Sequence, residues 1–428
     1  MSPPAESTLP IGSTLPAESA LPAEPSAHDF PRIKRSDPAF WRVTAPLAFG
    51  GFSTFALLYN VQPLLPLFSR SFAISPATAA LAVSLSTIVL SVSMIGAGAV
   101  ADLWGRKTVM AASIALSSLA ILIGAAAPNW PSFLALRALA GVTLAGLPAV
   151  AMAYLVDELD RQAVGIGMGL YIAGTTLGGM AGRLVAAAVS EHWSWRLAVA
   201  SAGALGSLGA LWIAFALPAS RHAPRGASFA ALWPGFGRAL ADPGLRLLFV
   251  EGFVVMGVFV CSYNYIGFRL AAPPFSLSQT VIGSVFVLYL IGAVSSMVMG
   301  GLADRFGRRR VLWIAIASEL VGVALTLPDN LVAAIAGVAL ITWGFFGAHT
   351  IASSWVGLRA PGARPQASAL YLFFYYIGSS LIGWLGGVFF AHGGWPAVVA
   401  LLTGLSAVGL AVAVRLAKVP PPAQLAGP

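Results

Sequence analysis

The chain has 428 residues, of which 58% are hydrophobic types and only 9% are charged. A soluble domain carries about 25% charged residues, so this composition excludes an ordinary soluble enzyme. A bilayer core requires about 20 apolar residues per spanning helix, and apolar runs of that length fill most of the chain. The formal net charge of +9 is better explained by orientation in a membrane than by binding to nucleic acid.

The two ends of the chain differ from the rest. Residues 1–40 repeat a Ser/Thr-Leu-Pro/Ala-Glu theme that cannot bury a core, so we expect a disordered tail. A signal peptide has a charged start, then an apolar stretch, then a cleavage site, and this segment lacks that order. The first spanning helix is therefore expected to direct insertion into the membrane. Residues 418–428 are expected to form a second loose tail.

Twelve apolar runs lie between the tails, and each predicts one membrane-spanning helix. They cover 44–66, 78–100, 108–127, 131–155, 163–188, 195–217, 247–268, 280–301, 311–327, 331–356, 366–390 and 395–416. A wider polar segment, 218–246, is expected to be a central cytoplasmic loop. The sequence therefore predicts an all-α integral membrane protein with six-helix bundles over 41–217 and 247–417.

The basic residues predict the orientation of these helices, because Lys and Arg accumulate in cytoplasmic loops. If both termini are cytoplasmic, most of the 24 Lys and Arg residues fall on that side. Only Arg70, Arg196 and Arg269 fall outside, and Arg137 and Arg183 lie within helices. We therefore expect a multi-pass protein with both termini in the cytoplasm.

The two six-helix halves repeat at a nearly constant offset. A shift of 202 residues places the segment 98–107 on 300–309, and a shift of 204 places Tyr59-Asn60 on Tyr263-Asn264. The same shift of 204 carries Tyr171 and Gly174 onto Tyr375 and Gly378, and a shift of 201 puts Pro148 on His349. These matches predict a duplicated unit whose halves enclose a cavity near mid-membrane.

These motifs resemble the major facilitator superfamily across all twelve helices. The Gly-x-x-x-Asp-x-x-Gly-Arg-Lys/Arg loop, present at 98–107 and 300–309, is that superfamily's most specific signature. The segments 59–66, 263–269 and 344–349 look like a bacterial inner-membrane branch of arabinose-efflux-like and multidrug exporters, which are drug:proton antiporters. The resemblance implies a two-bundle fold, alternating access, a bacterial inner-membrane location, a monomer and no cofactor.

The resemblance further implies that the two signature loops latch the bundles together on the cytoplasmic side. The glycines are expected to allow close helix approach and tight turns, and the aspartates to pair with nearby arginines. The residues concerned are Gly98, Asp102, Gly105, Arg106 and Lys107, with Gly300, Asp304, Gly307, Arg308 and Arg309. The alternative is a positively charged anchor with a glycine turn.

The helix over 163–188 resembles the superfamily's antiporter motif. Its glycines are Gly165, Gly174, Gly178, Gly179 and Gly182, with Gly179 where proline is usual. Close packing of small residues is the alternative explanation. Arg137 belongs to the same resemblance, with Ala140 where glutamine is expected, and either couples protons or substrate or reaches toward the outer interface. Arg183 is expected near the outer end of its helix, as a gating, interfacial or substrate-contacting residue.

Titratable groups inside the predicted bilayer are functional candidates because burying them is costly. Glu251, Glu319 and His349 are the proton-coupling candidates, and all lie in the second half. Helices of the first half hold no Asp or Glu, which departs from exporters of this family that carry an acid there. The alternatives are that Glu251 caps its helix, that Glu319 is a neutral packing residue, and that His349 bonds Thr350 or Ser353.

The repeated tyrosine and asparagine pairs are the candidates for lining a substrate cavity. With neighbouring residues they form the set Tyr59, Asn60, Gln62, Tyr263, Asn264 and Tyr265, to which Arg183 is added. Apolar rings and amide groups suit a small neutral or amphipathic solute such as a sugar or a drug. The alternative is interfacial anchoring by tyrosine.

These features favour a secondary transporter, and proton-coupled export is the leading hypothesis. An uptake symporter or facilitator on the same fold is the closest alternative, followed by a membrane sensor or an embedded enzyme. The single cysteine, Cys261, excludes a disulfide framework and a cysteine-based metal site, and no phosphate-binding Gly-x4-Gly-Lys-Ser/Thr motif is present. We expect small-molecule substrates, protons and lipid as partners, and neither a metal nor a cofactor.

Overall fold

The structure, a computed structural model, describes residues 32–220 and 233–420. All of the secondary-structure elements in these residues are helices. The first half contains α1 (Ala39–Tyr59), η1 (Gln62–Leu64), α2 (Leu65–Ser71), α3 (Pro76–Trp104), α4 (Arg106–Ala125), α5 (Trp130–Leu144), α6 (Gly146–Glu158), α7 (Arg161–His192) and α8 (Trp195–Ala216). The second half contains α9 (Trp233–Ala241), α10 (Pro243–Ala271), α11 (Gln279–Ser284), η3 (Val285–Leu288), α12 (Tyr289–Phe306), α13 (Arg308–Leu325), α14 (Leu331–Arg359) and α15 (Arg364–Lys418).

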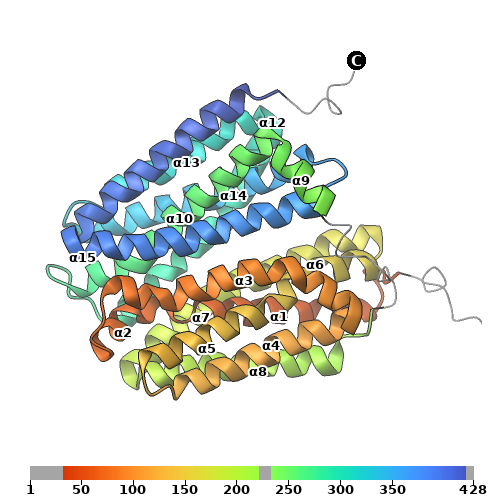
Figure 1. The fold of residues 1–428 in the computed structure, drawn as a ribbon, viewed down its shortest axis with the longest axis horizontal. Helices are drawn as coiled ribbons and strands as arrows, with labels where there is room; N and C mark the ends of the chain where they lie inside the picture. The colour runs from red at the N-terminus through yellow and green to blue at the C-terminus, as the bar shows by residue number, and fades with distance from the viewer. Residues whose placement is uncertain (1–31, 221–232, 421–428) are drawn as a thin grey trace, which may run out of the picture.

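These helices provide the twelve predicted membrane crossings. Nine helical segments among the described residues are long and apolar enough to span a bilayer, with α5–α6 and α11–α12 each forming one segment. The segment α15 crosses twice, because Gly393 and Gly394 leave helical geometry and the chain turns back there (Figure 1). The helices α1 and α13 provide the remaining two crossings, so the predicted all-helical fold class is confirmed.

The helices form two bundles that lie side by side (Figure 1). The helices α1–α8 surround one hydrophobic core and α9–α15 surround another. Corresponding helices pack in corresponding ways. A side chain at Gly174 of α7 would collide with the Ala48 carbonyl of α1, and one at Gly378 of α15 would collide with the Phe253 carbonyl of α10. The internal repeat is therefore a repeat of packing as well as of sequence.

The predicted tails and central loop need correction where the structure describes them. Residues 32–40 are not disordered, because the Ile33 amide donates to the Glu158 carbonyl (2.9 Å) and α1 begins at Ala39. The loop predicted over 218–246 includes α9 and the start of α10. Residues 419 and 420 of the predicted tail accept hydrogen bonds from Arg309 and Arg359. The remaining tail and loop predictions, over 1–31, 221–232 and 421–428, fall outside the described residues.

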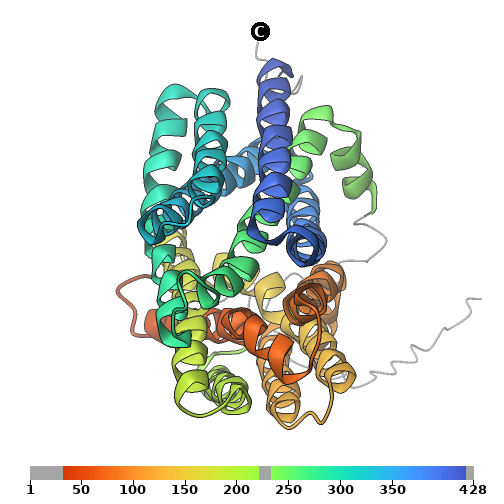
Figure 2. The same cartoon turned by 90° about the vertical axis from the view of Figure 1, so that its left-hand side faces the viewer.

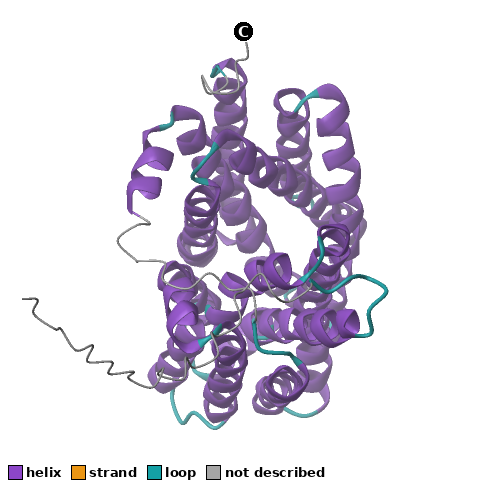
Figure 3. Cartoon of the chain, turned by 90° about the vertical axis from the view of Figure 1, so that its right-hand side faces the viewer, coloured by secondary structure: helices purple, strands orange, loops and turns teal. Residues whose placement is uncertain are grey.

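The two ends of the bundles differ in how closely the halves meet. We call the end that carries Gly105 and Gly307 the signature end, and the opposite end the far end. Viewed from the far end, the two halves abut; viewed from the signature end, their ribbons stand apart (Figures 2 and 3). In agreement, the Gln279 amide donates to the Pro63 carbonyl (2.5 Å) at the far end, and Thr87 and Ser380 share a hydrogen bond (2.8 Å) near mid-bundle. The structure is thus closed at the far end.

Three of the five glycines in the predicted antiporter motif are packing residues. Gly174, Gly178 and Gly182 recur every four residues on α7 and face the backbone of α1 at Ala48, Phe52 and Ala56. A side chain at any of them would overlap that backbone, so the two helices touch main chain to main chain. By contrast, a Cβ at Gly165 would meet nothing within 4 Å, and one at Gly179 would meet chiefly Arg183, at 3.2 Å from Nη1.

Arg137 also belongs to the packing of the first half. Its guanidinium donates to three backbone carbonyls, with Nε bound to Ala82 (2.9 Å), Nη1 to Leu57 (3.0 Å) and Nη2 to Leu58 (2.6 Å). The residue is only 2% exposed, so the alternative that it reaches toward the outer interface is wrong. Arg137 instead joins α5 to α1 and α3 with every guanidinium nitrogen in use.

We predict that Gly178→Ala destabilises the first half. The added methyl group would overlap the Phe52 backbone, and forcing such an insertion costs about 1–3 kcal/mol. Thermal unfolding of the purified protein in detergent would measure the loss. Gly165→Ala is the matched control, because its methyl enters open space and alanine favours a helix by about 0.5–1 kcal/mol. Equal melting temperatures for the two variants would contradict the packing argument.

Replacing Arg137 with lysine should lower the free energy of unfolding by about 3 kcal/mol, because one ammonium group cannot satisfy three divergent carbonyls. The same thermal assay applies. Arg196→Lys serves as the control, since Arg196 is exposed and makes a single backbone contact, to Ala127 (3.0 Å). A wild-type melting temperature for Arg137→Lys would show that the three carbonyl contacts do not hold the bundle.

Candidate functional site

A polar bridge joins the two halves near the far end. Arg183 of α7 donates from Nε to Gln62 Oε1 of η1 at 2.7 Å. Gln62 in turn donates from Nε2 to Asn264 Oδ1 of α10, also at 2.7 Å. These three side chains are at most 2% exposed. The bridge therefore connects first-half and second-half helices by neutral amide groups and one buried guanidinium.

Aromatic rings surround the guanidinium of Arg183. Its central carbon lies 4.3 Å from the ring centroid of Tyr59, 5.1 Å from that of Phe286 and 4.9 Å from that of Tyr289. Two of these rings come from the second half. Such faces attract a cation but do not neutralise it. The interfacial alternative for Arg183 is wrong, because its side chain is buried between the halves.

Within residues 32–220 and 233–420, no acidic side chain forms an ion pair with Arg183. Ion pairs there join Arg106 to Asp157, Arg269 to Asp329, Arg308 to Asp304 and Arg359 to Asp242. Arg183 uses Nη1 to donate to the Gly179 carbonyl of its own helix (2.6 Å). Its Nη2 makes none of the hydrogen bonds recorded among the described residues. The site thus presents a buried positive charge with a free donor.

The other predicted cavity residues are buried in the protein rather than exposed at an interface. Tyr263 and Tyr265 are tied into the second half, through Thr342 (2.8 Å) and the Gly383 carbonyl (2.6 Å) respectively. Asn60 is fully buried, and neither its amide nitrogen nor its oxygen has a hydrogen-bond partner. The Asn264 amide nitrogen is likewise unpartnered. Interfacial anchoring therefore does not describe these residues.

The second half contains a pair of buried carboxyl groups. Glu251 of α10 and Glu319 of α13 are both 0% exposed, and none of their four carboxyl oxygens has a hydrogen-bond partner. The Glu251 carboxyl faces α13, because its Oε1 and a methyl group of Ile316 flank the same position at Gly409, 3.5 Å and 3.3 Å from where a Cβ would lie. Glu319 lies one turn further along α13. The Tyr371 ring of α15 packs against α10 at Gly252, next to Glu251. The structure thus brings two of the three predicted proton-coupling residues together.

His349 of α14 joins this group through Tyr371. Its Nδ1 lies 3.0 Å from the Tyr371 hydroxyl oxygen, and its ring centroid lies 4.8 Å from that of Tyr375. The recorded partner is thus Tyr371, not Thr350 or Ser353. Sequence reasoning missed Tyr371, although its spacing of four from Tyr375 places both rings on one helix face. His349 and Tyr371 are thus hydrogen-bonded, and Tyr371 packs on α10 beside Glu251.

The alternative that Glu251 caps its helix is wrong. The helix α10 begins at Pro243, and Asp242 is its cap, accepting from the Leu245 amide at 2.7 Å. Glu251 therefore lies eight residues inside the helix. An acid at this depth has no stabilising role at a helix terminus.

The signature loops form similar turns in the two halves. Gly105 and Gly307 have φ values of +85° and +89°, which favour glycine over any other residue. Arg106 pairs with Asp157 of its own half, and Arg308 pairs with Asp304 at 2.9 Å. In this structure, which is closed at the far end, the ion-pair partners of Arg106 and Arg308 thus lie within their own halves.

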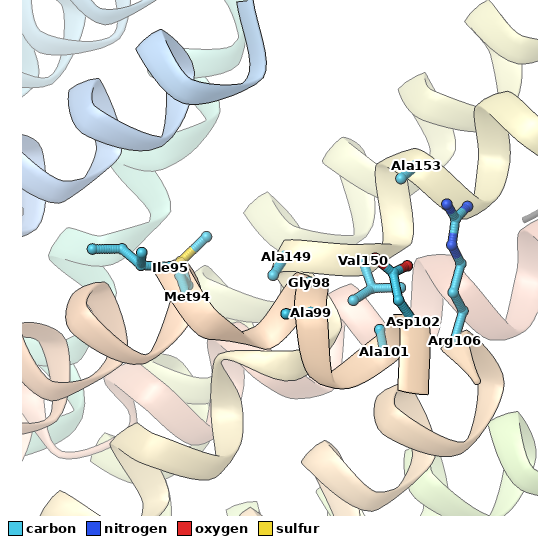
Figure 4. Close-up of a pocket in the computed structure, with 10 residues that line it drawn as sticks. All are labelled: Met94, Ile95, Gly98, Ala99, Ala101, Asp102, Arg106, Ala149, Val150 and Ala153. Atoms are coloured by element: carbon cyan, nitrogen blue, oxygen red, sulfur yellow. The ribbon is translucent and has the colours of Figure 1, made fainter. Parts of the chain in front are cut away.

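A small cavity lies beside the first signature loop, between α3 and α6. It has a volume of about 200 Å³ and includes Gly98, Asp102 and Arg106 among its walls (Figure 4). A Cβ at Gly98 would meet nothing within 4 Å, so the expected close helix approach at this glycine is absent here. Gly300 is also uncrowded, its nearest contact being Thr350 at 3.5 Å. Lys107 instead faces a groove between α4 and α8.

Within 32–220 and 233–420, no cluster of three or more His, Cys, Asp and Glu residues could hold a metal ion.

Known proteins share both the sequence pattern and the fold. The Major Facilitator Superfamily model matches residues 47–273 and 254–427. The inner membrane transport protein YnfM of Escherichia coli K12 is 42% identical over 385 residues, which cover 90% of this chain and 92% of that protein. The uncharacterized MFS-type transporter YybF of Bacillus subtilis is 39% identical over 387 residues, covering 90% and 96% respectively.

Solved structures with low sequence identity share the fold. The crystal structure of the nucleoside transporter NupG has a TM-score of 0.72 at 15% identity, covering 88% of this chain and 99% of that one. A bacterial homolog of the human lysosomal transporter Spinster, in an inward-facing and unoccupied conformation, has a TM-score of 0.69 at 17% identity and covers 89% and 95%. With the family match and the bacterial relatives, the chain belongs to the major facilitator superfamily and is a membrane-embedded transporter of small molecules, not an enzyme.

Proposed function

We propose that this protein is a proton-coupled exporter of a small amphipathic solute in a bacterial inner membrane. The observation that carries the proposal is that the protein holds two buried polar sites in different places, one where the halves meet and one within the second half. One is the Arg183–Gln62–Asn264 bridge, and the other is the Glu251–Glu319 pair with its neighbours Tyr371 and His349.

The bridge is the solute site in this proposal. It lies where the halves meet, and rearranging a few polar contacts there would release one half from the other. Two of the contacts between the halves at and near this level are neutral hydrogen bonds, Gln62 to Asn264 and Thr87 to Ser380. Each such bond contributes only about 0.5–1.5 kcal/mol, so closure of this end is reversible.

With the termini in the cytoplasm, as the basic residues predict, the far end is periplasmic and the halves are joined on the periplasmic side. The signature loops then lie at the cytoplasmic end. We propose that they latch the halves when that end closes. Asp102 is exposed and has no recorded ion pair among the described residues, so it is available for such a contact.

The carboxyl pair is the proton site. An ionised carboxylate without a hydrogen-bond partner is very costly to bury, so both groups are held as neutral acids in this conformation. Tyr371 and His349 connect the pair to a less buried part of the second half, because His349 is only half-buried. Proton loss would require the carboxylates to gain water or a new partner, which a change of conformation can supply.

Two observations bear on the direction of transport. The glycine face of α7 resembles that of antiporters, and this favours export in exchange for protons. The alternative, uptake by symport, is favoured by the fact that the bridge and the carboxyl pair have no residue in common. Separate sites can be occupied together, which suits cotransport. The sign of proton movement distinguishes the two directions.

We predict that Glu251→Gln and Glu319→Gln each abolish solute-driven proton movement while leaving the protein folded. Amides mimic the neutral acids but cannot release a proton. The measurement uses proteoliposomes with an internal pH dye and a panel of sugars, drugs and permanently ionised organic acids. Antiport makes the lumen more alkaline when solute enters, whereas symport makes it more acidic.

Tyr371→Phe should slow proton movement about tenfold, because it removes the hydroxyl that bonds His349 from a ring packed beside Glu251. Asp329→Asn is the control, since this carboxyl is 76% exposed and lies outside the buried pair. Solute equilibration without any pH change in the wild type would defeat proton coupling and leave a facilitator. Full proton movement in both glutamine variants would remove the carboxyl pair from the mechanism.

A further inference from the structure

We propose that the solute is a small organic anion whose carboxylate binds Arg183, with its apolar or aromatic body against Tyr59, Phe286 and Tyr289. This inference rests on the proposed function in taking the bridge as the transport site. It replaces the neutral solute that the amide-rich sequence pattern favours. The main evidence is the guanidinium of Arg183. It is buried between the halves and has, among the described residues, neither a counter-charge nor a full set of hydrogen bonds.

Arg137 shows what a purely structural arginine looks like in this protein. All three of its guanidinium nitrogens donate to backbone carbonyls. Arg183 is equally buried, at 2% exposed, but its third nitrogen, Nη2, has no recorded partner among the described residues. A guanidinium binds a carboxylate through two parallel hydrogen bonds, so a free nitrogen beside a hydrogen-bonded one suits that ligand.

The groups that face Arg183 are uncharged. The guanidinium lies over the rings of Tyr59, Phe286 and Tyr289, and it donates to the Gln62 amide oxygen and the Gly179 carbonyl. The two buried acids lie inside the second half, on α10 and α13, and their oxygens have no hydrogen-bond partner. An anion that enters the bridge would therefore supply the counter-charge that the chain does not.

Unpartnered polar atoms lie at the same interface. The Asn264 amide nitrogen and the Ser84 hydroxyl both lack a hydrogen-bond partner. Both lie near Gly383, at 3.1 Å and 3.4 Å from the position a Cβ would take there, so they cluster where α3 meets α15. Neither amide atom of Asn60 has a partner either. Buried polar atoms are normally satisfied, and these are placed to complete the binding of a polar ligand.

The rings around Arg183 indicate the rest of the ligand. Three aromatic faces lie within 5.1 Å of its guanidinium carbon, two from η3 and α12 and one from α1. A carboxylate bound at Nη2 would place an attached ring or chain beside these aromatic side chains, which provide apolar surroundings for it. A purely inorganic anion has no apolar part that could use them. The chemistry therefore favours an amphipathic acid.

The test compares matched acids and neutral analogues on the purified full-length protein in detergent. The probes are benzoate with benzyl alcohol, phenylacetate with phenylethanol, and gluconate with glucose. Binding is measured as the rise in melting temperature at increasing ligand concentration, since a ligand specific for the folded state stabilises it. We expect at least one aromatic acid to stabilise the protein by several degrees and its alcohol to have no effect.

Two variants identify the residue responsible. Arg183→Gln should weaken binding of that acid at least tenfold. Gln62→Glu should do the same while keeping the fold, because it places a carboxylate beside Arg183 and fills the site from within. The unpartnered Asn264 amide nitrogen can donate to this new carboxylate after an amide flip. Gln162→Glu, the same substitution on the exposed first turn of α7, is the control and should bind like the wild type.

The proposal is overturned if no acid stabilises the wild type, if alcohols stabilise it equally, or if both variants bind as the wild type does. These outcomes are separable from the failure of proton coupling. An acid that binds through Arg183 but moves no protons supports the anion site and defeats coupling. A neutral sugar or drug that drives proton movement, with no acid binding, supports coupling and overturns the anion site.

Discussion

Burying charge in a membrane is the constraint on which this structure depends. A charged side chain placed there must find hydrogen bonds, a counter-charge or a proton, because the surrounding medium cannot solvate it. Arg137 meets this requirement with three backbone carbonyls and so fixes the first half. Arg183 meets it only in part. Glu251 and Glu319 have no hydrogen-bond partner and meet it as neutral acids.

This constraint explains why the interface between the halves is polar but weakly bonded. A strong ion pair between Arg183 and a second-half acid would lock one conformation, because breaking a buried pair costs about 3–5 kcal/mol. Amide groups at Gln62 and Asn264 join the halves at lower cost. Main-chain contacts, of α7 on α1 in the first half and of α15 on α10 in the second, hold the helices of each bundle close together. Packing is therefore tighter inside each half than at the few polar contacts that join the halves.

The fold could be predicted from the sequence because the strongest signals in the sequence are local or repeated. Apolar runs specify the spans, and the constant offset between the halves specifies the duplication. The glycine spacing at Gly174, Gly178 and Gly182 correctly indicated a packing face. Local signals failed at helix ends: residues 32–40 are fixed by pairing with the turn after α6, and α9 is a short helix whose neighbours are remote in sequence.

The site was harder to predict because its members come from distant helices. The bridge residues Gln62, Arg183 and Asn264 come together only in the folded protein. No periodic pattern in the sequence indicates that they are neighbours. The depth of Arg183 was misjudged since α7 continues to His192, so the guanidinium lies well inside the far end. Tyr371 was missed because a tyrosine on a long helix has no distinctive spacing until its partner His349 is placed.

The two halves have diverged at the residues that carry charge. The offset that aligns Gly174 with Gly378 also aligns Arg183 with Gly387, and Leu47 with Glu251. Gly387 packs against the Ala77 backbone of the opposite half, where a long side chain has no space. The repeat thus keeps the glycines that pack helices and changes the residues that carry charge. A duplicated bundle with its guanidinium in one half and its acids in the other can bind a solute and a proton at different places. Movement of one half against the other can then link the two.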